Sequence, residues 1–101
     1  MEKRRPHHAL AAIKAAFADP AALNRTYTSK QGADALGMDD ATVVAVIQAL
    51  TVEDFDKSMT SHANHRVWQD VYRPKVSGTE LYVKFTLDAM DALLLISFKE
   101  A

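Results

Sequence analysis

The spacing of hydrophobic residues changes near residue 54, and this change limits the possible folds more than any other feature. Before it, apolar residues recur every three or four positions, as in Leu10, Ile13 and Phe17, which is the period of an amphipathic helix. After it, they alternate with polar residues, as in residues 81–87, which is the period of a half-buried strand. We therefore predict an α+β domain in which N-terminal helices pack on a C-terminal antiparallel sheet.

Residues 1 to about 50 are predicted to be helical. The first helix covers residues 10–17 and stops before Asp19–Pro20, because the residue before a proline avoids the helical region. Ser29 is the expected cap of a second helix that ends at Gly37. Between them, Tyr27 and its flanking threonines are compatible with a short strand. The third helix is expected to begin at Asp39 or Asp40 and to bury the stripe Val43, Val44, Ile47 and Leu50.

Four strands are predicted in the second half of the chain. They cover residues 55–59, 66–73, 81–87 and 92–98. The last of these is almost wholly apolar, so we expect a central strand that is covered on both faces. A chain of 101 residues and 11.2 kDa has room for one core, which predicts a single domain over residues 1–101.

Composition excludes several classes of protein. The net charge of −1 argues against a protein that coats nucleic acid by bulk charge. The absence of cysteine excludes a disulfide scaffold, a thiolate zinc site and a cysteine nucleophile. The apolar stretch after the basic residues 3–5 is interrupted at Lys14, too early for a signal peptide. No apolar run is long enough to cross a membrane, so we expect a cytoplasmic protein without a membrane partner.

Charge is unevenly distributed along the chain. Residues 39–56 contain five acidic residues and no basic one, whereas residues 57–87 contain five basic residues against two acidic ones. The strands are therefore locally positive in a slightly acidic chain. A confined positive patch of this kind suits a phosphate-bearing ligand. The alternative is that these lysines and arginines only solvate the sheet and prevent edge pairing, as exposed basic residues on strands commonly do.

Strand alternation assigns the polar side chains to faces. Tyr82 and Lys84 fall opposite the apolar row of their strand, so both are expected on the exposed face. Gln69 and Arg73 share one face of the second strand. Parity places Lys57 on the same face as Phe55 and Met59, which predicts a packed stem with an exposed amine.

The sequence contains few candidate ligands for a metal ion. His62 and His65 are spaced like a loose ligand pair, and Asp70 is the one further candidate. Because a zinc site needs three or four protein ligands, we expect no metal and no cofactor. A metal-dependent nuclease built on these three residues remains an alternative.

Several sequence strings carry a resemblance to a known family. They are K-S-M-T at residues 57–60, W-Q-D-V-Y-R-P at residues 68–74 and I-S-F-K-E at residues 96–100, together with the opening M-E-K-R-R-P-H. With them the chain closely resembles the MqsR family, the motility quorum-sensing regulators of bacterial toxin–antitoxin pairs. The resemblance implies a RelE-like fold and a toxin that cleaves mRNA, without a metal, at GCU triplets. Departures from the family pattern lie in the alanine-rich first helix, around residues 88–91 and at Ala101.

The resemblance also implies which residues act. The family's activity-linked positions correspond here to Lys57, Gln69, Tyr82 and Lys99. Lysines stabilise charge on the phosphate or transfer protons, the tyrosine transfers a proton or orients the phosphate, and the glutamine positions the RNA or reads a base. To these we add Arg73 as a phosphate clamp, His65 as a candidate acid and Lys84 as an RNA-binding residue.

The resemblance further implies a partner. The expected antitoxin has a zinc-binding N-terminal domain and a helix-turn-helix C-terminal domain, so DNA would be contacted only through it. Strand edges suit strand addition, and the acidic residues 39–56 suit a basic partner surface. The alternative function is a non-catalytic module that binds a DNA-binding antitoxin and tunes its repression.

Overall fold

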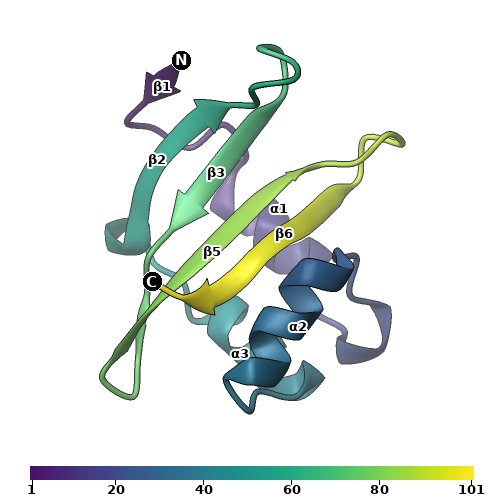
Figure 1. Cartoon of the computed structure of the whole chain (residues 1–101), viewed down its shortest axis with the longest axis vertical. Coiled ribbons are helices and arrows are strands. Elements are labelled where there is room, and N and C mark those ends of the chain that lie inside the picture. Colours follow the sequence, from purple (N-terminus) through teal and green to yellow (C-terminus); the bar gives the residue numbers. More distant parts are fainter.

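A six-stranded antiparallel sheet forms the framework of the molecule in the computed structural model, which describes all residues from 1 to 101 (Figure 1). The strands are β1 (Glu2–Lys3), β2 (Phe55–Thr60), β3 (Trp68–Tyr72), β4 (Lys75–Val76), β5 (Thr79–Leu87) and β6 (Leu93–Glu100). The helices are α1 (Leu10–Ala16), α2 (Tyr27–Ala35) and α3 (Asp40–Gln48), with short 3-10 helices η1 (Pro20–Ala22) and η2 (Val52–Asp54). The α+β prediction is confirmed. None of the helices has the length and apolar character needed to span a membrane.

The core lies between the helices and one face of the sheet. Leu81, Val83 and Phe85 of β5 are fully buried there, as their alternation predicts. The ring of Phe85 lies 5.4 Å from that of Phe17, which follows α1. On α3 the buried positions are 43, 46 and 47, so Val46 takes the core position that we had expected for Val44. The opposite face of the sheet carries no helix (Figure 1).

The start of α2 differs from the prediction. Thr26, not Ser29, is the cap, and its hydroxyl accepts a hydrogen bond from the Ser29 N–H at 3.1 Å. Ser29 is instead buried, and its hydroxyl donates to the carbonyls of Thr26 and Leu95. The expected strand at Tyr27 is also wrong, because this residue begins the helix. Gly37 ends the segment with a φ of 70°, as predicted.

Strand β6 is an edge strand, which corrects the prediction of a central one. It pairs with β5 alone, and β5 holds the central position. The outer edge of β6 is closed where Leu95 exchanges backbone hydrogen bonds with Asn24 and Thr26. Helix α2 covers it closely: a Cβ on Gly32 would lie 2.0 Å from the carbonyl oxygen of Phe98. The apolar run of β6 therefore reflects cover by a helix, not by a further strand.

A β-bulge changes the facing of Lys57. The register of β2 against β3 shifts between Phe55 and Lys57. Phe55 packs against the core, with its ring 5.5 Å from that of Tyr72, whereas Lys57 lies opposite Val71 on the other face. The expectation that Lys57 shares a face with Phe55 is therefore wrong, because one extra residue reverses the alternation.

The N-terminal segment is held by a buried carboxylate. Asp70 is fully buried on the core side and accepts hydrogen bonds from the hydroxyl of Ser58 at 2.6 Å and from the backbone N–H groups of His7 and His8. This anchor lets β1 pair with β2, a strand that the sequence pattern did not predict. No lysine or arginine pairs with Asp70, so its buried charge is stabilised by these three hydrogen-bond donors alone.

We expect Asp70→Asn to lower the free energy of unfolding by about 2–4 kcal/mol, because the amide group leaves at least one buried donor facing another donor. Urea unfolding at neutral pH measures the change. Asp34→Asn is the matched control: Asp34 makes only an exposed ion pair with Lys30, and its loss should cost less than about 0.5 kcal/mol. Equal effects at the two positions would show that Asp70 is not an anchor.

Candidate functional site

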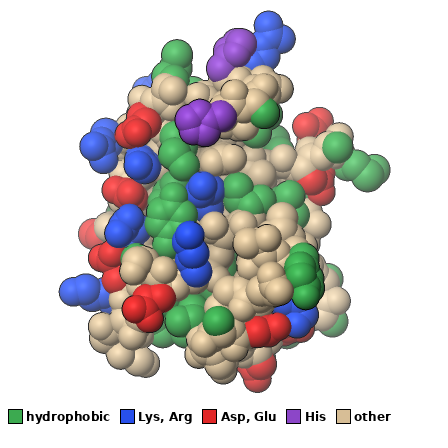
Figure 2. Space-filling model, viewed as in Figure 1, with side chains coloured by type: hydrophobic (Ala, Val, Ile, Leu, Met, Phe, Trp, Pro, Cys, Tyr) green, Lys and Arg blue, Asp and Glu red, His purple; other side chains and the backbone are tan.

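Four basic side chains converge on the open face of the sheet. They come from different elements: Lys57 from β2, Arg73 from the residue after β3, Lys84 from β5 and Lys99 from β6. With Tyr82, around which three of them lie, we call them the cation cluster. Figure 2 shows lysine and arginine side chains gathered on this face.

Strand register fixes the spacing of the cluster. Val71 pairs with Lys57 on one side and with Lys84 on the other, so the two lysines flank the same valine. Tyr82 pairs directly with Lys99. Val71 is fully buried but lies outside the main core cluster, because it faces the open side of the sheet, where its neighbours on both adjacent strands are lysines.

Tyr82 is the centre of the cluster. The Nζ atoms of Lys84 and Lys99 each lie 5.5 Å from the centre of its ring, and the guanidinium carbon of Arg73 lies 5.7 Å away. Such distances are typical of cation–π contacts. The phenol therefore sits in a strongly positive environment.

A pocket of about 340 Å³ opens between these side chains. It is lined by Arg73, Tyr82, Lys84, Ser97, Lys99, Glu100 and Ala101. All but Arg73 come from β5, β6 or the residue that follows β6. A hollow of this size with three cations and a phenol on its walls suits a small anionic group such as a phosphodiester.

The cations of the cluster differ in their partners. Glu2 lies 3.8 Å from Lys57, and Glu80 accepts two hydrogen bonds from Arg73, whereas no carboxylate pairs with Lys84 or Lys99. Burial lowers the pKa of Lys84 below its usual value, and the positive charges of Lys99 and Lys57 lower it further. Lys84 and Lys99 are thus the two cations of the cluster that make no ion pair within the chain.

Two of the predicted site residues lie outside this centre. Gln69 is on the same face, but two positions along β3 from Val71 and opposite Met59 of β2. His65 is in the turn that joins β2 to β3. This turn and the C-terminal end of β6 lie at opposite ends of the sheet (Figure 1), so the structure does not bring His65 to Tyr82 or Lys99.

The three candidate metal ligands do not assemble. Asp70 points into the core and is engaged by Ser58 and the segment at His7 and His8. Nowhere in the chain do three or more histidine, aspartate or glutamate side chains come together as a possible metal site.

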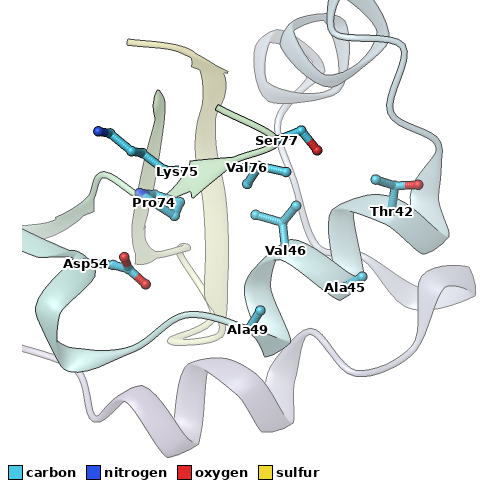
Figure 3. Close-up of a pocket in the computed structure, with 9 residues that line it drawn as sticks. All are labelled: Thr42, Ala45, Val46, Ala49, Asp54, Pro74, Lys75, Val76 and Ser77. Atoms are coloured by element: carbon cyan, nitrogen blue, oxygen red, sulfur yellow. The ribbon is translucent and has the colours of Figure 1, made fainter. Parts of the chain in front are cut away.

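A second pocket, of about 410 Å³, lies between α3 and the β4 hairpin (Figure 3). Apolar groups from Ala45, Val46, Ala49 and Val76 form much of its wall. Its one carboxylate, that of Asp54, already accepts hydrogen bonds from the backbone and hydroxyl of Thr51. The pocket is larger than the one at Tyr82, but only two of the residues that line it, Asp54 and Lys75, are charged.

Sequence reasoning missed three polar residues of the site. Glu2 lies on a strand of two residues, which is too short to show a period. Glu80 pairs with Arg73 across the β4 hairpin, which was not predicted. Ser97 was detectable, because it is the single polar residue in the apolar run 92–98.

We expect Lys84→Met to raise the free energy of unfolding at neutral pH. A lowered pKa means that the ammonium form costs the folded state stability. This cost is full at neutral pH, falls as the pH rises above the lowered pKa and is gone above the ordinary pKa of lysine in the unfolded chain. Because Lys84 is partly exposed, the gain should stay below about 1 kcal/mol. Urea unfolding at neutral and alkaline pH tests this, with the exposed Lys75→Met as control. A gain at Lys84 that persists unchanged at alkaline pH would contradict the assignment.

Comparison with known proteins identifies the family. Residues 5–100 match the family described as "Motility quorum-sensing regulator, toxin of MqsA". The chain is 39% identical over 100 residues to the mRNA interferase toxin MqsR of Escherichia coli (strain K12), and the alignment covers 99% of each chain. With the fold, these matches confirm the resemblance: the chain belongs to the motility quorum-sensing regulator family of toxins.

Proposed function

We propose that this endoribonuclease toxin acts on single-stranded mRNA, prefers GCU triplets, needs no metal ion and so inhibits translation and growth in the cytoplasm. The observation that carries the proposal is the convergence of Arg73, Lys84 and Lys99 around Tyr82 on an open sheet face, with Lys57 close enough to Lys84 to lower its pKa. The name of the Escherichia coli relative, an mRNA interferase toxin, supports the same activity.

RNA supplies its own nucleophile, the 2′-hydroxyl next to the scissile phosphate. An enzyme that uses it must align this oxygen with the phosphate, remove its proton, stabilise the added negative charge and protonate the departing 5′-oxygen. Fixed positive groups at the phosphate stabilise the charge without the reorganisation that water would require. The cation cluster provides such groups in a pocket on the sheet.

We assign the roles by position. Lys57 and Lys99 stabilise charge or transfer protons, and Tyr82, between cations, transfers a proton or orients the phosphate. Arg73 is the phosphate clamp, since Glu80 already holds its guanidinium in place. Lys84 binds the RNA backbone through its charge.

Gln69 and His65 belong to the flanks of this site. Gln69 lies on the same face but farther along β3, which suits reading a base or positioning the chain. His65, in the β2–β3 turn, is assigned to contacts with nucleotides away from the scissile phosphate rather than to proton transfer.

We further propose that the cognate antitoxin binds through its zinc-bearing N-terminal domain, with the helix-turn-helix domain left to contact DNA. Strand addition has two open edges available, β1 and the outer side of β4, because β6 is covered by residues 24–26 and α2. The acidic stretch is largely engaged within the chain: Asp39 caps α3, Asp40 pairs with Arg25, and Asp54 caps η2. Glu53 is the exposed acid of this stretch that makes no such contact.

Cleavage should continue in excess EDTA and leave a 2′,3′-cyclic phosphate and a 5′-hydroxyl, because the 2′-oxygen attacks and no metal site assembles. The test is mass spectrometry of the fragments of a defined RNA that contains GCU. The same RNA with a 2′-deoxy nucleotide at the scissile position is the control and should remain intact. Cleavage of that control would rule out the 2′-hydroxyl mechanism, and loss of activity in EDTA would favour the metal-dependent alternative.

We expect Lys57→Ala and Tyr82→Phe each to lower the single-turnover cleavage rate about 100-fold or more, the usual scale for one proton-transfer or charge-stabilising group. Their stability should change by less than about 0.5 kcal/mol, because both lie on the open face. Lys84→Ala is the matched comparison: it should weaken RNA affinity and reduce its salt dependence, with a small effect on the rate.

Equal rate losses at Lys84 and Lys57 would mean that the cluster works by bulk attraction. Unchanged rates in all three variants would instead mean that other residues perform the cleavage. Absence of cleavage by the wild-type chain itself would favour the alternative function, a non-catalytic module that tunes repression by its antitoxin.

A further inference from the structure

The carboxylate of Glu2 lies on the open face, beside the cation cluster. Glu2 pairs with Met59 across β1 and β2, and Met59 shares its face with Lys57 two positions before it. The Oε2 atom of Glu2 is 3.8 Å from the Nζ atom of Lys57. We propose that Glu2 is part of the RNA site. In the free protein its carboxylate pairs with the amine of Lys57, and an RNA phosphate takes the place of this carboxylate on binding.

The position of Glu2 is built into the fold. Lys3, the next residue, faces the other side of the sheet, where its Nζ lies 4.1 Å from the centre of the Trp68 ring and 2.9 Å from Nδ1 of His7. The backbone N–H of His7 donates to the buried carboxylate of Asp70. With Lys3 and His7 fixed on one face, the alternation of β1 sends Glu2 to the other.

The pair is suited to exchange. A separation of 3.8 Å is too long for a hydrogen bond, and the side chains of Lys57 and Glu2 are 30% and 55% exposed. Pairs of this kind contribute little net stability. By contrast, Glu80 accepts two hydrogen bonds from Arg73, at 3.0 and 3.2 Å. A phosphate oxygen in direct contact with Lys57 would form a shorter, charge-assisted hydrogen bond.

The consequence is a lowered affinity for RNA. Each ammonium that pairs with a phosphate releases counterions from the nucleic acid, and a lysine already balanced by a carboxylate releases fewer in net terms. Removing the Glu2 charge should therefore tighten binding and make it more sensitive to salt. This inference rests on the proposed function, since it assumes that RNA phosphate reaches Lys57.

The test is RNA binding by the full chain and by Glu2→Gln, Glu53→Gln, Lys57→Ala and the double variant Glu2→Gln/Lys57→Ala. The probe is a fluorescent single-stranded RNA with 2′-deoxy nucleotides throughout its GCU triplet, titrated over a series of KCl concentrations. Glu53→Gln is the matched control. Glu53 is exposed and makes no ion pair, and its substitution changes the net charge by the same amount as Glu2→Gln. Urea unfolding confirms that each variant is folded.

We expect Glu2→Gln to lower Kd about two- to five-fold relative to Glu53→Gln and to steepen the slope of log K against log salt by up to about 0.7, the value for one additional phosphate contact on a single strand. In the Lys57→Ala background the same substitution should have no effect beyond that of Glu53→Gln. A purely structural role for Glu2 would weaken binding and leave the slope unchanged.

Two outcomes would overturn the inference alone: equal effects of Glu2→Gln and Glu53→Gln, or an effect of Glu2→Gln that persists without Lys57. Both would leave the proposed function intact if the wild-type chain still binds and cleaves RNA. Absence of RNA binding and cleavage by the wild-type chain would overturn the proposed function and the inference together.

Discussion

The alternation of side chains along β5 is the constraint on which the rest of the molecule depends. Leu81, Val83 and Phe85 are buried because they face the helices. Since side chains alternate along a strand, Tyr82 and Lys84 must then lie on the open face. Because β5 is the central strand, its neighbours take their register from it. The pairing of Tyr82 with Lys99 and of Lys84 with Val71 follows from that register. Core and site are therefore two faces of the same strand.

The convergence of like charges distinguishes this face from a merely solvated one. Lysines that only solvate a sheet gain nothing from lying close together, since like charges repel and burial adds to the cost. Here Lys84 lies near both Lys99 and Lys57, and its pKa is lowered by burial and by them. The chain remains folded because the free energy gained by hydrophobic burial on the opposite face is much larger than this electrostatic cost. Local cost at a site supported by a stable framework is typical of binding and catalytic surfaces.

The sequence predicted those features that depend on long periodic patterns. Helix α1, the apolar row of β5 and the open-face positions of Tyr82 and Lys84 could all be inferred from hydrophobic period. The bulge before Lys57, the edge position of β6 and the pairing of β1 could not, because each depends on a single residue or on contacts between distant segments. Lys57 shows the consequence: parity alone assigned it to the wrong face. The resemblance implied Lys57, Tyr82 and Lys99 as candidate site residues, and the structure brings these three to one face of the sheet.

Strand β3 links the stability of the fold to the charge of the site. On its inner face Asp70 binds the backbone at His7 and His8 and so fixes the segment that leads into β1. On its outer face Val71 separates Lys57 from Lys84. A slip of one residue in this strand would send the carboxylate of Asp70 to the cation cluster and the valine to the core. The burial of Asp70 therefore favours a single register of β3, which keeps this carboxylate away from the cations. Through its hydrogen bonds to the segment that leads into β1, Asp70 also helps to place the carboxylate of Glu2 beside Lys57.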